Sequence, residues 1–361
     1  MKKITIVVGT RPNFIKVTQF KRLATEFKGL QIELVHTGQH FDEKMSLIFF
    51  EQFGLKPDHI INLNSTMVSA QIGEIMSKLE AYFLDSKPDV IVAVGDVNST
   101  LATALVANKM SIKLAHLESG LRSNDNTMPE EINRIITDQL ADIFLVTEES
   151  GCKNLLAEGK SPEKIFMVGN TMIDTMLAFD KEIDHSDILN ILDVESNEFV
   201  LMTIHRPATV DSLEGLQKIL DLIVSIPKNL KVVFPIHPRT IKNLEKHHLI
   251  DTFKNISSLI ITDPLDYFSF QKLIKECSFI LTDSGGIQEE STQRLIPCLT
   301  LRPNTERPVT VTSGTNTLVN FEIEEILKYI AQIQNGTYKK GEIPAFWDGN
   351  ATLRVLEIIL E

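Results

Sequence analysis

The sequence predicts an α/β protein with two doubly wound domains that face a cleft. Short apolar, β-rich runs alternate with helix-like stretches along the whole chain, which is the pattern of βαβ units in a parallel sheet. The runs form two series, separated by a polar stretch at residues 180–197. Because 361 residues are many for one core, and domains usually hold about 100–200, two series indicate two domains.

The apolar runs place the expected strands. In the first series they are ITIVV (4–8), IELVHT (32–37), VIVAV (90–94), LAHLE (114–118), DIFLVT (142–147) and KIFMVG (164–169). In the second they are FVLMTI (199–204), KVVFPI (231–236), LIIT (259–262), FILT (279–282) and CLTL (298–301). We therefore expect domains at residues 1–174 and 175–350, followed by a tail at 351–361 whose helical apolar spacing allows it to pack back across the boundary.

Composition and charge exclude several classes of protein. A formal net charge of −12 argues against a nucleic-acid or anionic-membrane surface. Cys152, Cys277 and Cys298 lie far apart without a CxxC pair, which is typical of a reducing compartment. The apolar run after Met-Lys-Lys is shorter than the ~7–15 residues of a signal-peptide core, and no run reaches the ~20 needed to cross a bilayer. We expect a cytoplasmic protein.

Polar residues follow nearly every expected strand. Ligands of open α/β sheets bind outside the carboxyl ends of the strands, so these positions are the candidates for a site. They include Arg11, Lys16, Gln39, His40, Asp96, Glu118, Arg122, His205, Arg206, His237, Arg239, Asp283 and the run 302–307. Such residues at so many strand ends favour a cleft between two domains.

The segment DSGGIQEE (283–290) resembles a phosphate cradle. Ser284, Gly285 and Gly286 would present backbone N–H groups at the positive end of a helix. A plain N-cap with glycines for a tight turn explains the same letters. Glu290, one turn into the helix, favours the cradle because its carboxylate could accept hydrogen bonds from ribose hydroxyls. Phosphate and ribose together indicate a nucleotide.

The segment GTRPNFIK (9–16) indicates a second anion-binding turn. Arg11 could contact phosphate through two N–H groups, and Lys16 falls about one turn into the following helix. A lone lysine at such a position is usually solvated. Its neighbour Arg11 and the second anion-binding turn favour a binding role.

Three acids carry the chemical hypothesis. Asp96 follows one strand, Glu118 ends another, and Glu130 lies four residues before Arg134 on one expected helix face. Each acid also has a structural explanation, as an N-cap, a solvated strand end or a surface ion pair. Because carboxylates crowded in a partly dry site do not all ionise freely, one of them could act as a base.

The histidines indicate ligand contacts and no metal site. The nine histidines form no HExxH or HxH group, so we expect no metal. We interpret His205 and His237 as partners of a diphosphate or of sugar hydroxyls.

Ten motifs in order resemble the non-hydrolysing UDP-N-acetylglucosamine 2-epimerases. They are GTRPNFIK (9–16), HTGQH (36–40), GDVNST (95–100), HLESGLRS (116–123), MPEEINR (128–134), VGNTMID (168–174), TIHRP (203–207), IHPR (236–239), LTDSGGIQEE (281–290) and TERP (305–308). The resemblance implies two Rossmann-like domains of GT-B type, a UDP-sugar substrate, no cofactor, a homodimer, and a C-terminal helix that returns to the first domain.

The resemblance also implies roles for individual residues. Those matched to positions around the sugar and its diphosphate are Lys16, Asp96, Glu118, Glu130, Arg134 and His205. Those matched to UDP contacts are Arg11, Ser284, Gly285, Gly286 and Glu290, with Phe270 near the uracil. The implied reaction inverts C2 of UDP-N-acetylglucosamine by elimination and re-addition of UDP through 2-acetamidoglucal, for synthesis of cell-surface polysaccharide precursors.

Departures from the common family pattern leave other substrates and functions open. Asn13-Phe14 stands where many relatives have Glu-Ala, and Ala208-Thr209-Val210 where many have a Glu-Asn pair. The segments 36–54 and 128–134 also resemble relatives that act on UDP-2,3-diacetamido-glucuronate. A GT-B glycosyltransferase, or less plausibly a UDP-sugar sensor, would use the same cradle.

A second, regulatory substrate site of some bacterial relatives is expected to be empty. Those relatives use a Gln-His-x-Gln motif and a later arginine, whereas this chain reads Gln39-His40-Phe41-Asp42 and has no arginine between Arg22 and Arg122. The acid at position 42 would repel a diphosphate, and the missing arginine removes a contact to it.

Overall fold

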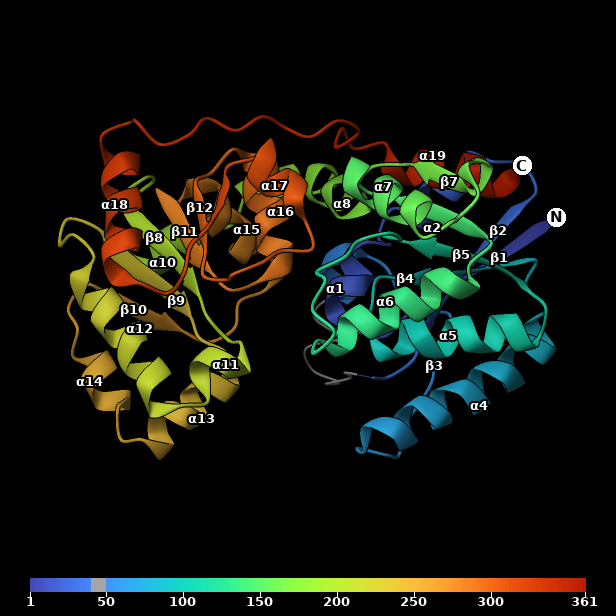
Figure 1. The fold of residues 1–361 in the computed structure, drawn as a ribbon, viewed down its shortest axis with the longest axis horizontal. Coiled ribbons are helices and arrows are strands. Elements are labelled where there is room, and N and C mark those ends of the chain that lie inside the picture. The colour runs from blue at the N-terminus through green and yellow to red at the C-terminus, as the bar shows by residue number, and fades with distance from the viewer. Residues whose placement is uncertain (40–49) are drawn as a thin grey trace. The chain divides into compact units, whose positions relative to one another are not determined.

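The chain folds into two compact units, each built on one parallel sheet (Figure 1). The computed structural model describes residues 1–39 and 50–361. The first unit contains Met1–Ala178 and Ala345–Glu361, and the second contains Phe179–Pro344. The sequence placed the boundary at 174/175, four residues before the one observed here.

In the described residues of the first unit, seven parallel strands form a sheet in the order β3-β2-β1-β4-β5-β6-β7. Their bounds are Lys2–Val8 (β1), Leu30–His36 (β2), His59–Ile60 (β3), Val90–Val94 (β4), Lys113–Leu117 (β5), Ile143–Val146 (β6) and Ile165–Met167 (β7). The central strand β4 is buried along its whole length, as expected of a parallel strand covered on both faces. The strand order reverses between β1 and β4, so a ligand is expected outside the carboxyl ends of these two strands.

Helices connect the strands of the first unit (Figure 1). Their bounds are Arg11–Ile15 (α1), Phe20–Ala24 (α2), Val68–Ser86 (α4), Asn98–Lys109 (α5), Pro129–Leu140 (α6), Glu149–Ala157 (α7), Thr171–Ala178 (α8) and Ala351–Leu360 (α19), with a short 3-10 turn at Pro162–Lys164. The tail helix α19 packs against α2 and α8. The buried carboxylate of Asp174 accepts hydrogen bonds from the backbone N–H groups of Ala351 (3.2 Å) and Thr352 (2.6 Å), which fixes the start of this helix.

The second unit repeats the doubly wound order. Its six parallel strands follow the order β10-β9-β8-β11-β12-β13, with the reversal between β8 and β11. They span Phe199–Thr203 (β8), Lys231–Pro235 (β9), Leu259–Thr262 (β10), Phe279–Thr282 (β11), Cys298–Thr300 (β12) and Asn316–Leu318 (β13). The helices span Asp180–Asp184 (α9), Ile188–Leu192 (α10), Pro207–Val210 (α11), Leu213–Ser225 (α12), Pro238–Lys246 (α13), Ile250–Lys254 (α14), Tyr267–Glu276 (α15), Gly285–Arg294 (α16), Pro308–Thr312 (α17) and Ile323–Gln334 (α18).

The predicted fold class, α/β with two doubly wound units, is confirmed. Every expected apolar run forms a strand within about two residues of the predicted bounds. Two strands were missed, the edge strands β3 and β13, which are short and carry no apolar run. None of the helices in the described part of the chain is long and apolar enough to cross a membrane.

Candidate active site

The turn after β1 meets the end of β4 at the point where the strand order of the first unit reverses. Thr10 is the extended N-cap residue of α1, and Pro12 follows in the first turn of the helix. The Thr10 hydroxyl donates to the Asn13 side-chain oxygen (2.9 Å), and the Asn13 amide donates to the Val94 carbonyl (3.2 Å). These bonds join the two turns and hold Lys16, the C-cap residue of α1, at the same edge of the sheet.

Lys16 and Glu118 form a buried ion pair at this edge. The Lys16 Nζ lies 2.5 Å from the Glu118 Oε2, and the two residues are only 7% and 5% exposed. Glu118 adopts a left-handed backbone conformation with a φ of 72°, which is rare and strained for a residue other than glycine. Its other oxygen, Oε1, is buried and accepts no hydrogen bond from the described residues. The sequence predicted both residues for the site, and the structure brings them together.

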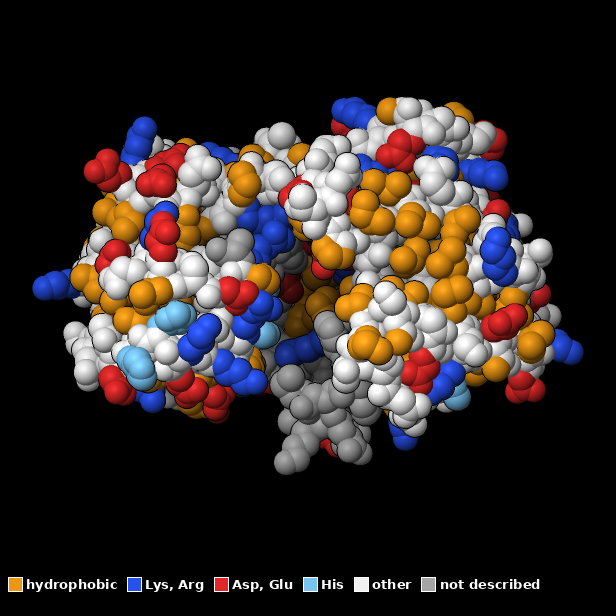
Figure 2. Space-filling view, turned by 60° about the horizontal axis from the view of Figure 1, so that its bottom comes forward, with side chains coloured by type: hydrophobic (Ala, Val, Ile, Leu, Met, Phe, Trp, Pro, Cys, Tyr) orange, Lys and Arg blue, Asp and Glu red, His pale blue; other side chains and the backbone are white. Residues whose placement is uncertain are grey.

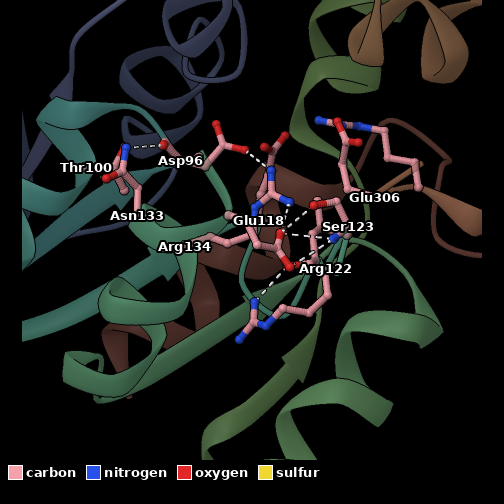
Figure 3. A network of polar contacts seen from close by, with 12 residues as sticks. Asp96, Thr100, Glu118, Arg122, Ser123, Asn133, Arg134 and Glu306 are labelled. Atoms are coloured by element: carbon pink, nitrogen blue, oxygen red, sulfur yellow. Dashed lines mark hydrogen bonds and ion pairs between the residues drawn. The ribbon is translucent and has the colours of Figure 1, made fainter. Parts of the chain in front are cut away.

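Asp96 extends from the turn after β4 and pairs with Arg134 of α6 (Figure 3). The preceding Gly95 has a φ of 68°, and a Cβ atom there would lie 2.8 Å from the Asn13 amide nitrogen, so the turn requires glycine. Asp96 is more exposed than Arg134, with 28% against 3% of the side chain accessible. Asp96 therefore combines a buried partner with access to solvent.

Arg134 pairs with Glu131, and not with Glu130 as the helical spacing suggested. Arg134 binds Glu131, three residues before it, at 2.7 Å, while Glu130 is exposed in the first turn of α6. Glu131 is 1% exposed and also accepts hydrogen bonds from the backbone N–H groups of Ser123 and Asn124. Its carboxylate thus binds both Arg134 and the loop after β5.

In the second unit, His205 and Asp283 meet where the strand order reverses. His205 follows β8 and Asp283 follows β11, and the His205 Nδ1 lies 2.8 Å from the Asp283 Oδ1. The other Asp283 oxygen accepts from the backbone N–H groups of His205 (2.9 Å) and Arg206 (2.8 Å). Burial raises the pKa of Asp283, but these hydrogen bonds and the His205 charge outweigh burial and lower the pKa below its usual value. The carboxylate orients the His205 ring, which stays half-exposed.

The predicted phosphate cradle forms the start of α16. Ser284 is its N-cap residue, with extended backbone, and no side chain caps the helix. Nothing lies within 4 Å of a Cβ atom placed on Gly286, so this part of the turn opens to free space. A Cβ on Gly285 would meet Glu306 Oε1 at 2.8 Å and Arg307 NH1 at 3.0 Å. The turn is therefore free on one side and packed against charged groups on the other.

These charged groups form a buried cluster beside the cradle, and the sequence offered the run 302–307 as a candidate for the site without giving its residues a role. Arg307 pairs with Glu289 and Glu306, at 2.6 Å in each case, and Arg302 donates to Glu306 at 2.9 Å. The signal was present, because residues 302–307 follow β12 at the same sheet edge, but their pairing was not predictable.

Two predicted nucleotide contacts are largely or partly buried in the second unit. Glu290 is 6% exposed. Burial of Tyr267 raises the pKa of this tyrosine, and the negative charge of Glu290 raises it further. Phe270 of α15 is partly buried and packs against an apolar cluster that includes Leu273 and Ile287. Arg11, in the first unit, is half-buried at the start of α1.

His237 is exposed at the N-cap of α13, where its Nδ1 accepts from the Arg239 backbone N–H at 3.1 Å. Partial burial, the nearby His205 and Arg239 lower the pKa of His237. A groove of about 640 Å³ runs from His237 past Lys242 and Lys246. Figure 2 shows basic and histidine side chains gathered on this part of the second unit. Asp211 also lines this groove and pairs with Arg239, which leaves Lys242 and Lys246 as the other cations of its lining.

Three of the four residues that stand in place of the regulatory motif lie outside the described residues. These are His40, Phe41 and Asp42. Gln39 is described, and its side-chain oxygen accepts from the Ser99 backbone N–H (2.9 Å) and hydroxyl (2.7 Å) at the start of α5. Within residues 1–39 and 50–361, no three His, Cys, Asp or Glu side chains are grouped to hold a metal ion.

Comparison with known proteins identifies similar sequences and structures. The family model described as UDP-N-acetylglucosamine 2-epimerase matches residues 22–360. A UDP-N-acetylglucosamine 2-epimerase of Methanocaldococcus jannaschii is 39% identical, over 99% of this chain and 98% of the relative. The crystal structure of the M. jannaschii UDP-GlcNAc 2-epimerase in complex with UDP-GlcNAc and UDP matches with a TM-score of 0.90 at 38% identity, covering 99% of both chains.

A relative with a different substrate is nearly as similar. The UDP-2,3-diacetamido-2,3-dideoxy-D-glucuronate 2-epimerase of Pseudomonas aeruginosa is 36% identical over 99% of both chains.

Proposed function

The chain belongs to the UDP-N-acetylglucosamine 2-epimerase family, and from this premise we propose that it interconverts UDP-N-acetylglucosamine and UDP-N-acetylmannosamine. The observation that carries the proposal is the set of buried and half-buried charges at the switch point of the first unit. Lys16 with Glu118, and Arg134 with Asp96, supply two cations and two carboxylates at one sheet edge. Such a set serves both the removal of a proton and the stabilisation of a leaving diphosphate.

The proposed reaction is an elimination followed by re-addition. A carboxylate takes the C2 proton while the C1–O bond breaks, its electron pair stays on the UDP oxygen, and a C1–C2 double bond forms. A proton then returns to the opposite face of C2, and the UDP oxygen adds again to C1. Because the C2 proton is weakly acidic, cations near the diphosphate must stabilise the charge that develops there.

We assign different parts of the substrate to residues of the two units. In the first unit we assign Lys16, Asp96, Glu118, Glu130 and Arg134 to the sugar and its diphosphate, with Arg11 beside them. The exposed position of Glu130 at the start of α6 leaves it available to a ligand.

In the second unit we assign the UDP contacts to Ser284, Gly285, Gly286, Glu290 and Phe270. We assign His205 and His237 to the diphosphate and the sugar hydroxyls. The free side of the α16 turn and the buried Asp283 that orients His205 support this assignment. A homodimer, a cytoplasmic location and a role in making polysaccharide precursors stay predictions.

The second candidate substrate is UDP-2,3-diacetamido-2,3-dideoxy-D-glucuronate. The observation that favours it is the 36% identity, over 99% of both chains, to the epimerase that carries this substrate in its name. Both substrates would use the same elimination, so they differ only in the groups at C3 and C6 of the sugar.

Proton NMR of the purified protein with each UDP-sugar in D2O tests the proposal. We expect UDP-N-acetylmannosamine to form from UDP-N-acetylglucosamine alone, with deuterium at C2. Conversion of the diacetamido sugar only would select the second candidate. No conversion of either sugar without an acceptor would refute epimerisation, and product that keeps its original C2 hydrogen would refute the elimination.

A further inference from the structure

A buried chain of charged and polar groups lies beneath the two turns that carry Asp96 and Glu118. His116 of β5 and Asp138 of α6 are both 0% exposed. The His116 Nδ1 lies 2.6 Å from the Asp138 Oδ1, and the His116 Nε2 lies 2.7 Å from the Gly95 carbonyl oxygen. The sequence reasoning assigned neither residue to the site.

The partners of the ring determine its protonation state. A carboxylate and a carbonyl oxygen only accept hydrogen bonds, so both ring nitrogens must donate. A neutral imidazole has one N–H group and would direct a lone pair at one of the two oxygens. Both contacts are satisfied at once when each ring nitrogen carries a proton.

Asp138 also contacts a buried arginine. The Arg122 guanidinium lies 2.7 Å from the Asp138 Oδ2 and binds both oxygens of Glu158 at 2.8 Å. Burial raises the pKa of Asp138, but His116 and Arg122 outweigh burial and lower it below its usual value, so the carboxylate stays charged. Glu158 is solvent-exposed, with 30% of its side chain accessible, so within the buried region the Arg122 guanidinium is the cation that faces the Asp138 carboxylate beside His116.

Asp138 reaches both turns of the site. Through His116 it holds the Gly95 carbonyl, which directly precedes Asp96. Its Oδ2 also accepts from the Gly120 backbone N–H at 3.1 Å, two residues after the strained Glu118. One buried carboxylate is thus linked to the backbone on which both proposed catalytic acids stand.

We propose that His116 is a positioning residue which carries both ring protons and, together with Asp138, sets the turns that present Asp96 and Glu118. This inference rests on the proposed epimerase function. The imidazolium does not touch the sugar; it fixes the Gly95 carbonyl, and thereby the direction in which Asp96 leaves the β4–α5 turn.

The proton count is measured on the wild-type protein. NMR of histidine-labelled (15N) protein at pH 7.5 should show one ring with both nitrogens protonated, and the signal should be absent from the spectrum of His116→Gln. A His116 ring with one unprotonated nitrogen at this pH would overturn the proposal. The spectrum needs no substrate, so it remains decisive even if the protein shows no epimerase activity, a result that would instead refute the proposed function.

The positioning role is tested by kinetics of two matched variants. Asp138→Asn removes the charge that holds the imidazolium, and we expect kcat to fall at least about tenfold, with KM changed by less than about threefold. Glu158→Gln alters another partner of Arg122 that does not touch His116, and should keep kcat within about twofold. Wild-type kcat in Asp138→Asn, or an equal loss in Glu158→Gln, would contradict the proposal. If Asp138→Asn does not fold, the 15N spectrum of the wild-type protein still tests whether His116 carries both ring protons.

Discussion

Removal of one partner from the Lys16–Glu118 pair should destabilise the first unit strongly. Both side chains are nearly buried and lie 2.5 Å apart, so Lys16→Met leaves a carboxylate without a cation in a dry environment. Breaking a buried pair in this way costs about 3–5 kcal/mol of unfolding free energy. The double variant Lys16→Met/Glu118→Gln removes both charges and should recover all but about 1–2 kcal/mol of the loss.

The fluorescence of the single tryptophan isolates the first unit in this experiment. Trp347 is 1% exposed, and its indole N–H donates to the Thr147 carbonyl at 3.2 Å, so its emission should change when this unit unfolds in urea. Lys153→Met serves as the control, because Lys153 forms an exposed ion pair with Glu149 in the same unit. That change should cost less than about 0.5 kcal/mol.

Activity separates the chemical from the structural role of the pair. Lys16→Met, Glu118→Gln and the double variant should each lose at least about 10²-fold in kcat, because each lacks at least one of the proposed catalytic groups. The double variant should lose this activity although its stability is largely recovered. If the losses of stability in the two single variants simply add in the double variant, Lys16 and Glu118 are not coupled. The reasoning about a buried pair would then be wrong.

Three further predictions follow from other parts of the chain. Burial lowers the pKa of His36 to about 4, so unfolding takes up a proton below pH 6.5. The first unit should lose about 1.3 kcal/mol of stability between pH 7.5 and 5.5 through this group, and urea unfolding of His36→Asn should show that much less acid sensitivity. Calorimetry of Gly285→Ala should show a loss of ~1–3 kcal/mol in unfolding free energy, because the new Cβ atom meets buried charged groups. Gly286→Ala should be neutral or slightly stabilising, because nothing lies near its Cβ position. Equal effects of the two substitutions would contradict this packing. The rate should depend hyperbolically on UDP-sugar concentration, and a sigmoidal curve abolished by Gln39→Ala would reveal a regulatory site.

Apolar runs were sufficient to predict the sheets because buried parallel strands need them. The run at 90–94 became β4 with the predicted bounds, and the tail at 351–360 became α19. The edge strands β3 and β13 were missed because they are short and carry no apolar run. The other two edge strands, β7 and β10, carry such a run and were predicted.

Pairings within the site were less predictable, since they depend on contacts between distant segments. Lys16 and Glu118 are 102 residues apart, and only the folded chain shows that they meet. Arg134 contacts Glu131 and Asp96, and the sequence offered Glu130 as an equally good neighbour on the helix. His116 lies in the middle of a buried strand, where a lone histidine carries no pattern that points to its partner.

Helix α6 shows why the buried charges of the site are hard to predict from the sequence pattern. Glu131, Arg134 and Asp138 recur at a spacing of three and four residues, on one helix face, and each is at most 2% exposed, whereas Ile132 is 41% exposed. An ordinary surface helix buries its apolar stripe, because buried charges cost several kcal/mol each. This helix buries the charged face instead, and its three charged groups hold two segments. Glu131 binds the loop after β5 at Ser123, and Arg134 binds the β4–α5 turn at Asp96. Asp138 binds the loop after β5 at Gly120 and reaches the β4–α5 turn at Gly95 through His116. A face of this composition is a poor choice for stability alone, so its presence is best explained by the precision that catalysis requires of the turns above it.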